Sequence, residues 1–394
     1  MNSDLPTGPI LSGATLGVFG GGQLGRMFAM AATQMGYRTM VFAPEADPPA
    51  AQVASLHVRA DYRNDDAVRH FAAQCDAVTL EFENVPAETL ELAARHTLTR
   101  PGPKVLAVAQ DRLRERAFLD RHDLPCAAHR PAYSAADAVE AVNRLGIPVV
   151  LKTARLGYDG RGQRRVDLVE QAGDAWRALG EQPVLCEGWV HYQCELSVLV
   201  ARSPDGEMQT FGPIRNEHAN HILDVSSVPA GVSTPVARHA VELARRVATA
   251  IELEGLICVE MFLTEEGNLL INELAPRPHN SGHLTIEACL VSQFEQQVRA
   301  VCNLPLGEMT LRGPTAMVNL LGDLWNGGEP DWAAVLGSDD RLRLHLYGKQ
   351  SARPGRKMGH MTAVATSADK ARSAALRARR RLGRQSLAAM ADDS

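Results

Sequence analysis

Residues 271–283 have the sequence INELAPRPHNSGH, and this stretch decides how the rest of the chain is interpreted. The apolar residues 269–271 predict a strand that carries Asn272 and Glu273 side by side. Mg²⁺ prefers oxygen ligands, so a carboxylate beside an amide at the end of such a strand is typical of a magnesium site. Residues 277–283 then gather an arginine, small polar residues and a glycine just before an expected helix, a pattern that suits a phosphate or another anion. The stretch therefore predicts metal–nucleotide chemistry next to a substrate anion.

The composition predicts an ordinary globular protein. A length of 394 residues predicts two or three domains, and a net charge of −5 gives no reason to expect nucleic acid or an anionic membrane as a partner. The 7 cysteines are odd in number and show no CxxC spacing, which indicates reduced thiols and not a disulfide framework or a zinc site. No apolar run is long enough to span a membrane, and residues 1–12 do not resemble a signal peptide. We therefore expect a cytoplasmic protein.

Strand and helix patterns alternate in the first part of the chain. The apolar strand at residues 16–19 runs into a glycine-rich loop and a helix that Gly36 ends, and further strands are expected at residues 39–42 and 77–80. This alternation predicts a doubly wound parallel sheet, an α/β domain over residues 14–112.

The following part is predicted to be an α+β domain over residues 113–312. Strands at 149–152, 184–187, 195–200 and 257–262 follow one another with few helices between them, which favours antiparallel pairing. Two further strands, at residues 342–346 and 361–365 after a loop-rich stretch, predict a small β-rich domain over residues 313–394.

The loop GGGQLG at residues 20–25 has the glycine spacing of a dinucleotide-binding turn. Glu45 follows at about the distance of a ribose-binding acid, so a nicotinamide-dependent dehydrogenase or a non-catalytic nucleotide sensor is an alternative to other functions. The signal is weak because any strand-to-helix turn that holds a phosphate needs the same glycines. Gln23 and Arg26 also add polar groups that a pyrophosphate loop does not require.

A second glycine-rich loop, GYDGRGQ at residues 157–163, follows Lys152, which ends a predicted strand. Glycines let backbone N–H groups approach phosphate oxygens, and a lysine adds a positive charge. No Gly-Lys-Ser/Thr sequence follows, so the loop is not a Walker loop. A tight β-hairpin with a polar tip is the structural alternative.

Two acids favour the nucleotide interpretation. Glu260 is expected to end one strand and Glu273 the next, with a turn at Glu266 and Gly267 between them. Adjacent hairpin strands would bring the two carboxylates close together, where they repel unless a cation lies between them. With the neutral oxygen of Asn272 beside them, they predict a Mg²⁺–ATP site.

Several motifs carry a family resemblance: GGGQLGR at 20–26, EFEN at 81–84, Lys152 with GYDGRGQ at 157–163, NELAPR and HNSGH within 272–283, and RPGRKMGH at 353–360. With these motifs the chain resembles the ATP-grasp superfamily and, within it, the N5-carboxyaminoimidazole ribonucleotide synthetase family. The resemblance extends from Leu16 to about Thr362. The acid pair is general to ATP-grasp enzymes, whereas the other motifs together are specific to this family.

The resemblance implies an ATP-grasp fold with the N-terminal parallel-sheet domain and small C-terminal β-rich domain described above. It implies a carbon–nitrogen ligase of de novo purine biosynthesis that uses ATP and bicarbonate to carboxylate 5-aminoimidazole ribonucleotide, through carboxyphosphate, with release of ADP and phosphate. ATP and Mg²⁺ are the implied cofactors. The implied partners are small molecules, with no nucleic acid and no membrane, and a homodimer is the family expectation.

The resemblance also implies roles for individual residues. The expected ATP-binding residues are Arg112, Lys152, Gly157, Tyr158, Asp159, Gly160, Arg161, Gly162, Gln163, Glu187, Gly188, Trp189, Val190, Glu195, His218, Asn272 and Glu273. Glu260 and Glu273 are the expected metal ligands. The expected ribonucleotide-binding residues are Gln23, Glu83, Asp159, Arg161, Arg277, His279, Asn280, Ser281, Lys349 and Arg356. Asp159, Arg161 and Arg277 are the expected catalytic residues.

Three further alternatives remain at this point. A formate-dependent formyltransferase acting on a related ribonucleotide is the nearest enzyme in the same superfamily. Glu187 could be a solvated acid at a strand end and not a nucleotide contact. His279 and His283 have the spacing of zinc ligands on a helix, although Pro278 and Gly282 argue against an uninterrupted helix there.

Overall fold

The N-terminal part of the molecule is a parallel sheet with helices around it. The computed structural model describes residues 8–157, 162–339 and 341–392, with side chains up to residue 382. The sheet has the strand order β3-β2-β1-β4-β5 and all of its pairs are parallel, which confirms the predicted doubly wound domain. Its elements are β1 (Thr15–Phe19), α1 (Gln23–Gln34), β2 (Arg38–Phe42), β3 (Leu56–Val58), α2 (Asp65–Ala72), β4 (Ala77–Leu80), α3 (Ala87–Ala93), β5 (Leu98–Thr99) and α4 (Pro103–Ala109).

The central strands of this sheet are buried because their residues are largely hydrophobic. Every residue of β1 and β4 is buried, as expected for parallel strands with helices on both faces. Phe19, Phe42 and Phe71 pack against one another with ring centroids 5.0–5.4 Å apart, and they belong to one hydrophobic core of this domain.

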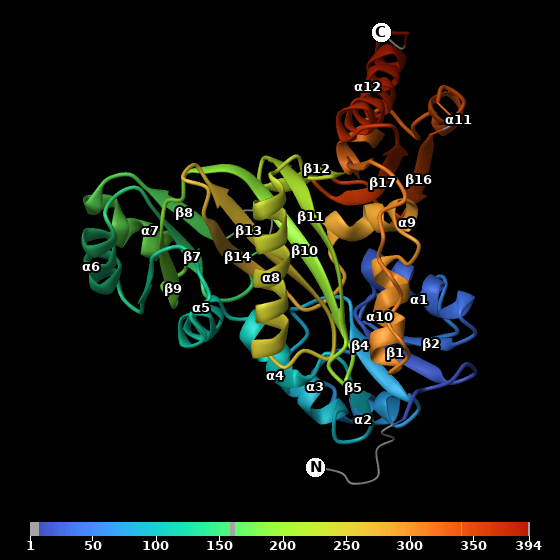
Figure 1. Cartoon of the computed structure of the whole chain (residues 1–394), viewed down its shortest axis with the longest axis horizontal. Coiled ribbons are helices and arrows are strands. Elements are labelled where there is room, and N and C mark those ends of the chain that lie inside the picture. The colour runs from blue at the N-terminus through green and yellow to red at the C-terminus, as the bar shows by residue number, and fades with distance from the viewer. Residues whose placement is uncertain (1–7, 158–161, 340, 393–394) are drawn as a thin grey trace.

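Helix α5 (Arg112–Arg121) leads from this domain into a separate lobe, which Figure 1 shows at the left end of the molecule. The lobe is a four-stranded antiparallel sheet with the order β6-β9-β7-β8, covered by α6 and α7. Alanines, valines and Trp176 fill the space between the sheet and the two helices. The elements of the lobe are β6 (His129–Ala132), α6 (Ala135–Leu145), β7 (Val149–Thr153), β8 (Gln163–Val166), α7 (Ala172–Ala178) and β9 (Val184–Gly188).

An eight-stranded antiparallel sheet connects the lobe to the other end of the molecule. Its order is β14-β13-β10-β11-β12-β15-β17-β16, and α8 and α10 pack against its strands. Its elements are β10 (Tyr192–Arg202), β11 (Met208–Ala219), β12 (Ile222–Val228), α8 (Thr234–Ala250), β13 (Gly255–Thr264), β14 (Leu269–Ala275), α9 (Thr285–Ala288), α10 (Gln293–Val301), β15 (Thr315–Leu321), α11 (Trp332–Leu336), β16 (Leu342–Leu346), β17 (Lys357–Val364) and α12 (Ala368–Asp392).

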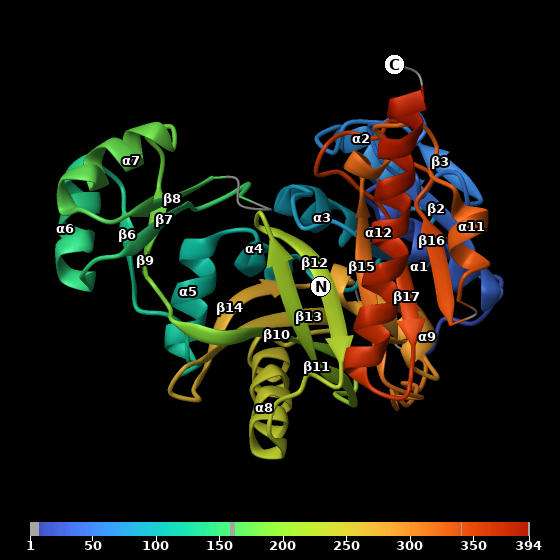
Figure 2. The same ribbon diagram turned by 90° about the horizontal axis from the view of Figure 1, so that it is seen from above.

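The C-terminal strands continue this sheet, because β15 pairs with β12 over four residues. The division into three domains at residues 112 and 312 therefore stays a prediction. Figures 1 and 2 show the N-terminal sheet and the C-terminal strands together at the end opposite the lobe. The side chain of Gln52 joins the two parts by donating to the carbonyl oxygen of Gly348 at 2.9 Å.

One local prediction was wrong. Glu260 and Glu273 were expected at strand ends, but both lie within longer strands, since β13 extends to Thr264 and β14 to Ala275. The expected loop-rich stretch after β15 consists mostly of turns and coil, with a short 3₁₀ helix (Gly322–Trp325) and α11 within it. The error arises because a charged residue inside a strand resembles a strand end in the sequence.

Candidate active site

The two acids expected to hold a metal lie opposite each other. Glu260 on β13 and Glu273 on β14 are direct partners in the antiparallel register, which confirms that the hairpin brings them together. Each carboxylate also has a cationic neighbour. Nε2 of His279 is 2.9 Å from Glu260, and Nη1 of Arg112 is 3.4 Å from Glu273. These neighbours reduce the repulsion between the two carboxylates.

Glu260 and His279 form an ion pair in which each favours the charge of the other. Burial disfavours ionisation of Glu260, but the charge and the hydrogen bond of His279 outweigh it and lower the pKa of Glu260. Burial also disfavours the imidazolium of His279, but Cys258 and Glu260 raise its pKa. An ionised carboxylate opposite a second carboxylate, with the amide of Asn272 adjacent in the chain, is an oxygen-only donor set that fits Mg²⁺.

On the side of the lobe, Lys152 forms an ion pair with Glu187. The residue Glu187 is only 4% exposed, so the alternative of a solvated acid was wrong. Arg116 donates to the same carboxylate from Nε at 3.2 Å and from Nη2 at 2.8 Å. Burial opposes the charge of Glu187, but Lys152 and Arg116 lower its pKa to about 2. The two cations therefore keep Glu187 ionised inside the protein.

The second glycine-rich loop follows β7 and leads into β8, and these two strands pair antiparallel with Lys152 opposite Gln163. Gly157 accepts a hydrogen bond from Nη2 of Arg112 at 3.3 Å. Gly162 has a φ of +70°, and a Cβ there would lie 2.5 Å from Oγ1 of Thr153, so glycine is required. Four of the expected site residues lie outside the described residues: Tyr158, Asp159, Gly160 and Arg161.

The remaining expected ATP-binding residues lie between the lobe and the central sheet. The backbone N–H groups of Gly188 and Trp189 donate to carbonyls of the lobe at 2.8 and 3.1 Å. The ring of Trp189 lies under the guanidinium of Arg165, at 4.3 Å from the ring centroid. Val190 follows, and Glu195 forms an ion pair with His218 between β10 and β11.

The residues expected to bind the ribonucleotide form a second polar cluster. Arg277 forms an ion pair with Glu83 of the N-terminal domain. Ser281 contacts the ring of His279 at 2.8 Å, and its hydroxyl also contacts that of Ser197. Asn280 is buried, and neither atom of its side-chain amide has a hydrogen-bond partner within the described part of the chain. The amide of Asn280 therefore has an unsatisfied donor and an unsatisfied acceptor among the described residues.

Residues from the two ends of the chain approach this cluster. Arg277 and Lys349 both act electrostatically on Glu81, which follows β4 in the N-terminal domain. Nζ of Lys349 donates to the carbonyl oxygen of Lys357 at 2.6 Å. Gln23 is the first residue of α1. Arg356 instead donates to Ser351 within its own turn, so the structure does not place it in contact with the cluster.

The first glycine-rich loop binds a carboxylate of the protein itself. Glu81 accepts hydrogen bonds from the backbone N–H groups of Gly22 at 2.8 Å and Gly25 at 3.3 Å. A Cβ at Gly22 would lie 2.8 Å from both carboxylate oxygens, so close approach of Glu81 explains why the loop needs glycine. The anion site at the N-terminus of α1 is therefore filled, and the loop gives no support to a dinucleotide-dependent enzyme.

Comparison with known proteins agrees with this arrangement. Sequence models match at residues 13–110 for the ribonucleotide synthetase preATP-grasp domain, at 117–294 for the ATP-grasp domain, and at 315–374 for the phosphoribosylaminoimidazole carboxylase C-terminal domain. The N5-carboxyaminoimidazole ribonucleotide synthase of Bacillus subtilis is 42% identical over 353 residues, which cover 90% of this chain and 92% of the relative. The chain belongs to the N5-carboxyaminoimidazole ribonucleotide synthase family.

Solved structures of this synthase family have the same fold. An N5-carboxyaminoimidazole ribonucleotide synthetase in complex with ADP superimposes with a TM-score of 0.90 at 40% identity, covering 95% of this chain and 98% of that one. The Aspergillus clavatus synthase in complex with ADP and 5-aminoimidazole ribonucleotide superimposes with a TM-score of 0.86 at 32% identity, covering 94% and 99%. The predicted family and ATP-grasp fold are thus confirmed. None of the described helices is both long and apolar enough to cross a membrane.

The zinc alternative for this synthase was wrong, because His279 and His283 face different partners. His279 contacts Glu260, whereas the fully buried ring of His283 stacks on His360 at 4.7 Å between ring centroids. His360 in turn stacks on His345 at 4.4 Å. This row of imidazoles packs the 3₁₀ turn at Asn280–Leu284 against β16 and β17.

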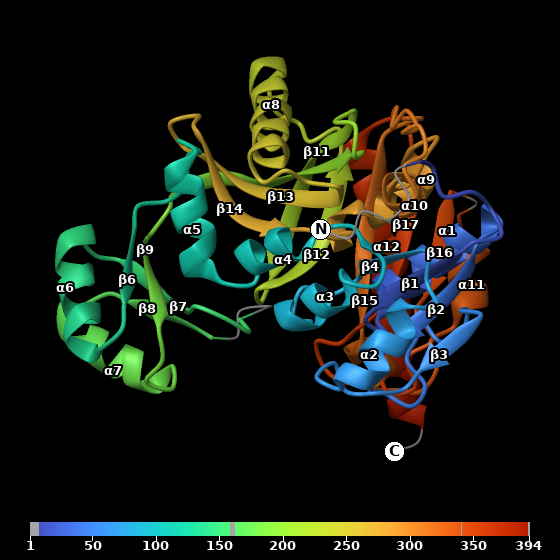
Figure 3. The same ribbon diagram turned by 90° about the horizontal axis from the view of Figure 1, so that it is seen from below.

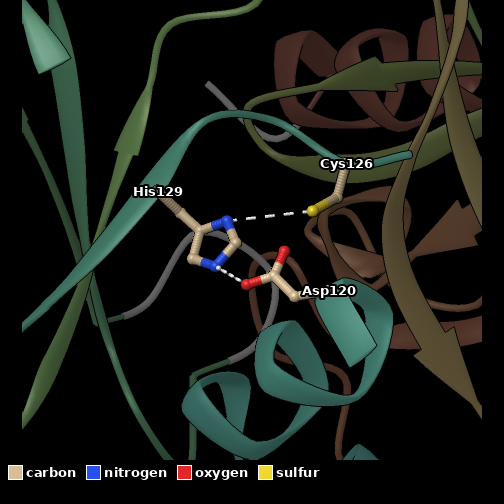
Figure 4. Close-up of side chains that lie close together, drawn as sticks. All are labelled: Asp120, Cys126 and His129. Carbon is tan, nitrogen blue, oxygen red and sulfur yellow. Dashed lines mark hydrogen bonds and ion pairs between the residues drawn. The ribbon is translucent and has the colours of Figure 1, made fainter. Parts of the chain in front are cut away.

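A second group of metal-ligating side chains lies at the base of the synthase lobe, where Asp120, Cys126 and His129 approach one another (Figure 4). The thiol is 3.8 Å from Nδ1 of His129, and the carboxylate is 3.2 Å from Nε2. The thiol and the carboxylate face different nitrogens of the imidazole, whereas a metal ion would bind only one of these nitrogens. Nδ1 is also 3.0 Å from the carbonyl oxygen of Ala127. The geometry is a hydrogen-bonded chain and not an assembled metal site.

Arg116 and Glu81 make contacts within this arrangement, but no pattern in the sequence assigned either of them a role. Their partners lie 71 and 59 residues away in the chain, at Glu187 and Gly22 respectively. One signal was present for Arg116. It follows Arg112 by one helical turn, so both arginines project from the same face of α5.

Proposed function

We infer that this protein catalyses the ATP-dependent carboxylation of 5-aminoimidazole ribonucleotide to N5-carboxyaminoimidazole ribonucleotide. The observation that carries this inference is the position of the Glu260–Glu273 pair. Arg112 connects the pair to the glycine-rich hairpin of the lobe, and His279 connects it to the cluster around Arg277. In this proposal the nucleotide and substrate sites would meet at one pair of carboxylates.

We propose that the lobe binds ATP. Lys152, Arg112 and the 157–163 loop would contact the phosphates, and the segment from Glu187 to Val190, with Glu195 and His218, would contact the nucleoside. Within this segment, Glu187 would contact the nucleoside through its backbone, while its buried carboxylate would act through Lys152. Mg²⁺ held by Glu260, Glu273 and the oxygen of Asn272 would neutralise charge on the transferred phosphoryl group.

We propose that a bicarbonate oxygen attacks the γ-phosphorus of ATP, so that ADP leaves and carboxyphosphate forms. The exocyclic amine of the ribonucleotide then attacks the carboxyl carbon, and phosphate leaves with that bicarbonate oxygen. Arg277, which is half-buried and paired with Glu83, would stabilise the anion next to the acid pair. Asp159 and Arg161 of the loop would contact both the substrate and the reacting groups. Closure of the site would exclude water from carboxyphosphate.

We propose that the ribonucleotide lies in the cluster formed by Gln23, Glu83, Arg277, His279, Asn280, Ser281, Lys349 and Arg356. Its phosphate requires cationic side chains and its amine and ribose require oxygen acceptors. The unpartnered amide of buried Asn280 and the convergence of Arg277 and Lys349 near Glu81 support this placement.

The proposed function is tested by measuring the release of ADP from ATP in parallel incubations that differ in ribonucleotide, bicarbonate and formate. We expect ADP only when the ribonucleotide and bicarbonate are both present with ATP. A reaction that needs formate and not bicarbonate would indicate the related formyltransferase. Nucleotide binding without turnover in any mixture would indicate a sensor.

The setting of the enzyme is also part of the proposal. The seven cysteines are unpaired in the structure, and such thiols fit a reducing compartment such as the cytoplasm. We propose small-molecule partners only, and a homodimer as in the family expectation. Sedimentation of the purified protein tests the dimer, since a monomer at micromolar concentration would contradict it.

A further inference from the structure

Two consecutive residues of α5 hold the strand that carries the metal ligand Glu273. β14 is an edge strand of the central sheet, and among the described residues its outer edge is met by only one isolated bridge, between Ile271 and Cys126. Arg116 Nη2 donates to the carbonyl oxygen of Asn272 at 2.7 Å, and the N–H of Leu274 donates to Glu115 at 2.6 Å. These are the two peptide groups on either side of Glu273. Side chains of α5 therefore replace a neighbouring strand at the metal ligand.

The same two residues connect β14 to the lobe. Arg116 also donates to the carboxylate of Glu187 on β9 through Nε at 3.2 Å and Nη2 at 2.8 Å. Nη1 of Arg116 contacts Glu115 at 3.2 Å. The side chains of Glu115 and Arg116 are both only 1% exposed. Figures 2 and 3 show α5 between β9 and β14, where it can transmit the position of one to the other.

Glu187 divides its two oxygens between two cations. Oε1 faces Arg116 and Oε2 faces Lys152. A buried carboxylate that loses its only partner is strongly disfavoured. Because Arg116 holds Oε1 with two hydrogen bonds, Lys152 can turn toward a nucleotide phosphate without leaving Glu187 unpaired.

We propose that Arg116, supported by Glu115, is a positioning residue that aligns the phosphate-binding Lys152 of the lobe with the metal ligand Glu273 of the central sheet. The proposal rests on the proposed function, because it assumes that these residues bind Mg²⁺ and nucleotide. Arg116 itself touches neither ligand. Its effect is to fix the distance between the two ends of one Mg²⁺–nucleotide site.

Arg116→Gln is the principal test, with Arg114→Gln as a matched control on the exposed face of the same helix. We expect Arg116→Gln to weaken binding of Mg²⁺–ADP about tenfold or more, and to raise the Mg²⁺ concentration for half-maximal binding. The KM for the ribonucleotide should change by less than about twofold, since its cluster lies on other elements. Arg114→Gln should behave as the wild type does.

Two further variants separate positioning from folding. Arg116→Lys retains the charge but not the two-pronged donor, so it should fold and bind Mg²⁺–ADP with an affinity between those of the wild type and Arg116→Gln. Added guanidinium should restore part of the nucleotide affinity of Arg116→Ala. A lowered unfolding temperature with unchanged affinity for Mg²⁺–ADP, in either Arg116→Gln or Arg116→Lys, would overturn the proposal.

The binding measurements also distinguish this proposal from the proposed function. They need only Mg²⁺ and ADP and no carboxylation. If the wild type bound Mg²⁺–ADP but formed no carboxylated product, the proposed function would fail while the positioning role could still be measured. If the wild type carboxylated the ribonucleotide and Arg116→Gln bound Mg²⁺–ADP normally, only the positioning role would fail.

Discussion

Glu260 and Glu273 are direct cross-strand partners in the β13–β14 pair, and each has a cationic side chain as a neighbour. Such a pair of carboxylates favours a divalent cation between them.

We predict that Glu273→Gln lowers turnover by roughly 10²-fold or more, because the amide keeps the shape of the side chain but removes the charge of a metal ligand. Steady-state rates across a Mg²⁺ titration check this. Glu266→Gln in the turn between the strands is the control, and near-normal rates of Glu273→Gln at saturating Mg²⁺ would make Glu273 a structural residue.

The contact of Glu81 with the first glycine-rich loop predicts a stability effect. Gly22→Ala should lower the free energy of unfolding by about 1–3 kcal/mol, since the methyl group would displace Glu81 and leave buried polar groups unpaired. The φ of Gly22 is −77°, so the effect would come from crowding and not from backbone strain. Urea unfolding measures it, with Gly8→Ala as the control because a Cβ there meets no neighbour. Equal stability of the two variants would contradict the assignment.

The ion pairs of Glu187 predict a dependence of stability on pH. Its pKa is about 2 in the folded protein, below the value of 4.5 expected without partners. A lowered carboxylate pKa contributes stability above the unfolded-state pKa, and this contribution is lost as the pH falls toward the folded-state pKa. The stability difference between the wild type and Glu187→Gln should therefore be largest above pH 5 and shrink toward pH 3. Unfolding at several pH values measures it, and a difference that is constant or grows on acidification would refute the pairing.

Arg356 is expected to bind the ribonucleotide phosphate although it contacts Ser351 in the structure. We predict that Arg356→Ala raises the KM for the ribonucleotide about tenfold and leaves the KM for ATP nearly unchanged, because a phosphate contact contributes uniform binding energy. Initial-rate kinetics for both substrates check this against Arg377→Ala on the exposed face of α12. A loss confined to ATP binding would assign the C-terminal segment to the nucleotide instead.

The proximity of the two hairpin carboxylates was predictable from the sequence because it depends only on local strand pairing. Glu260 and Glu273 lie on strands joined by a short turn, so their proximity followed from strand pairing alone. The parallel N-terminal sheet followed from alternating strand and helix patterns for the same reason. The exact strand ends did not, because polar residues within β13 and β14 concealed how far the strands continue.

Contacts between distant segments were not predictable in this way. The glycines of residues 20–25 indicated an anion at a helix N-terminus, but nothing in the loop showed that Glu81 supplies it. Arg116 was one arginine on a helix rich in charged residues until the fold placed Glu187 and Asn272 beside it. The pairing of β12 with β15 likewise depends on how the central sheet closes, and no local pattern of residues 313–394 specifies it.

The most direct test of the account is a single short incubation with ATP, 5-aminoimidazole ribonucleotide and bicarbonate labelled with both ¹³C and ¹⁸O. If the acid pair activates bicarbonate through carboxyphosphate, mass spectrometry will find the ¹³C carboxylate on the ribonucleotide amine and one ¹⁸O atom in the inorganic phosphate. Phosphate without ¹⁸O, or a ribonucleotide without ¹³C, would contradict the central claim.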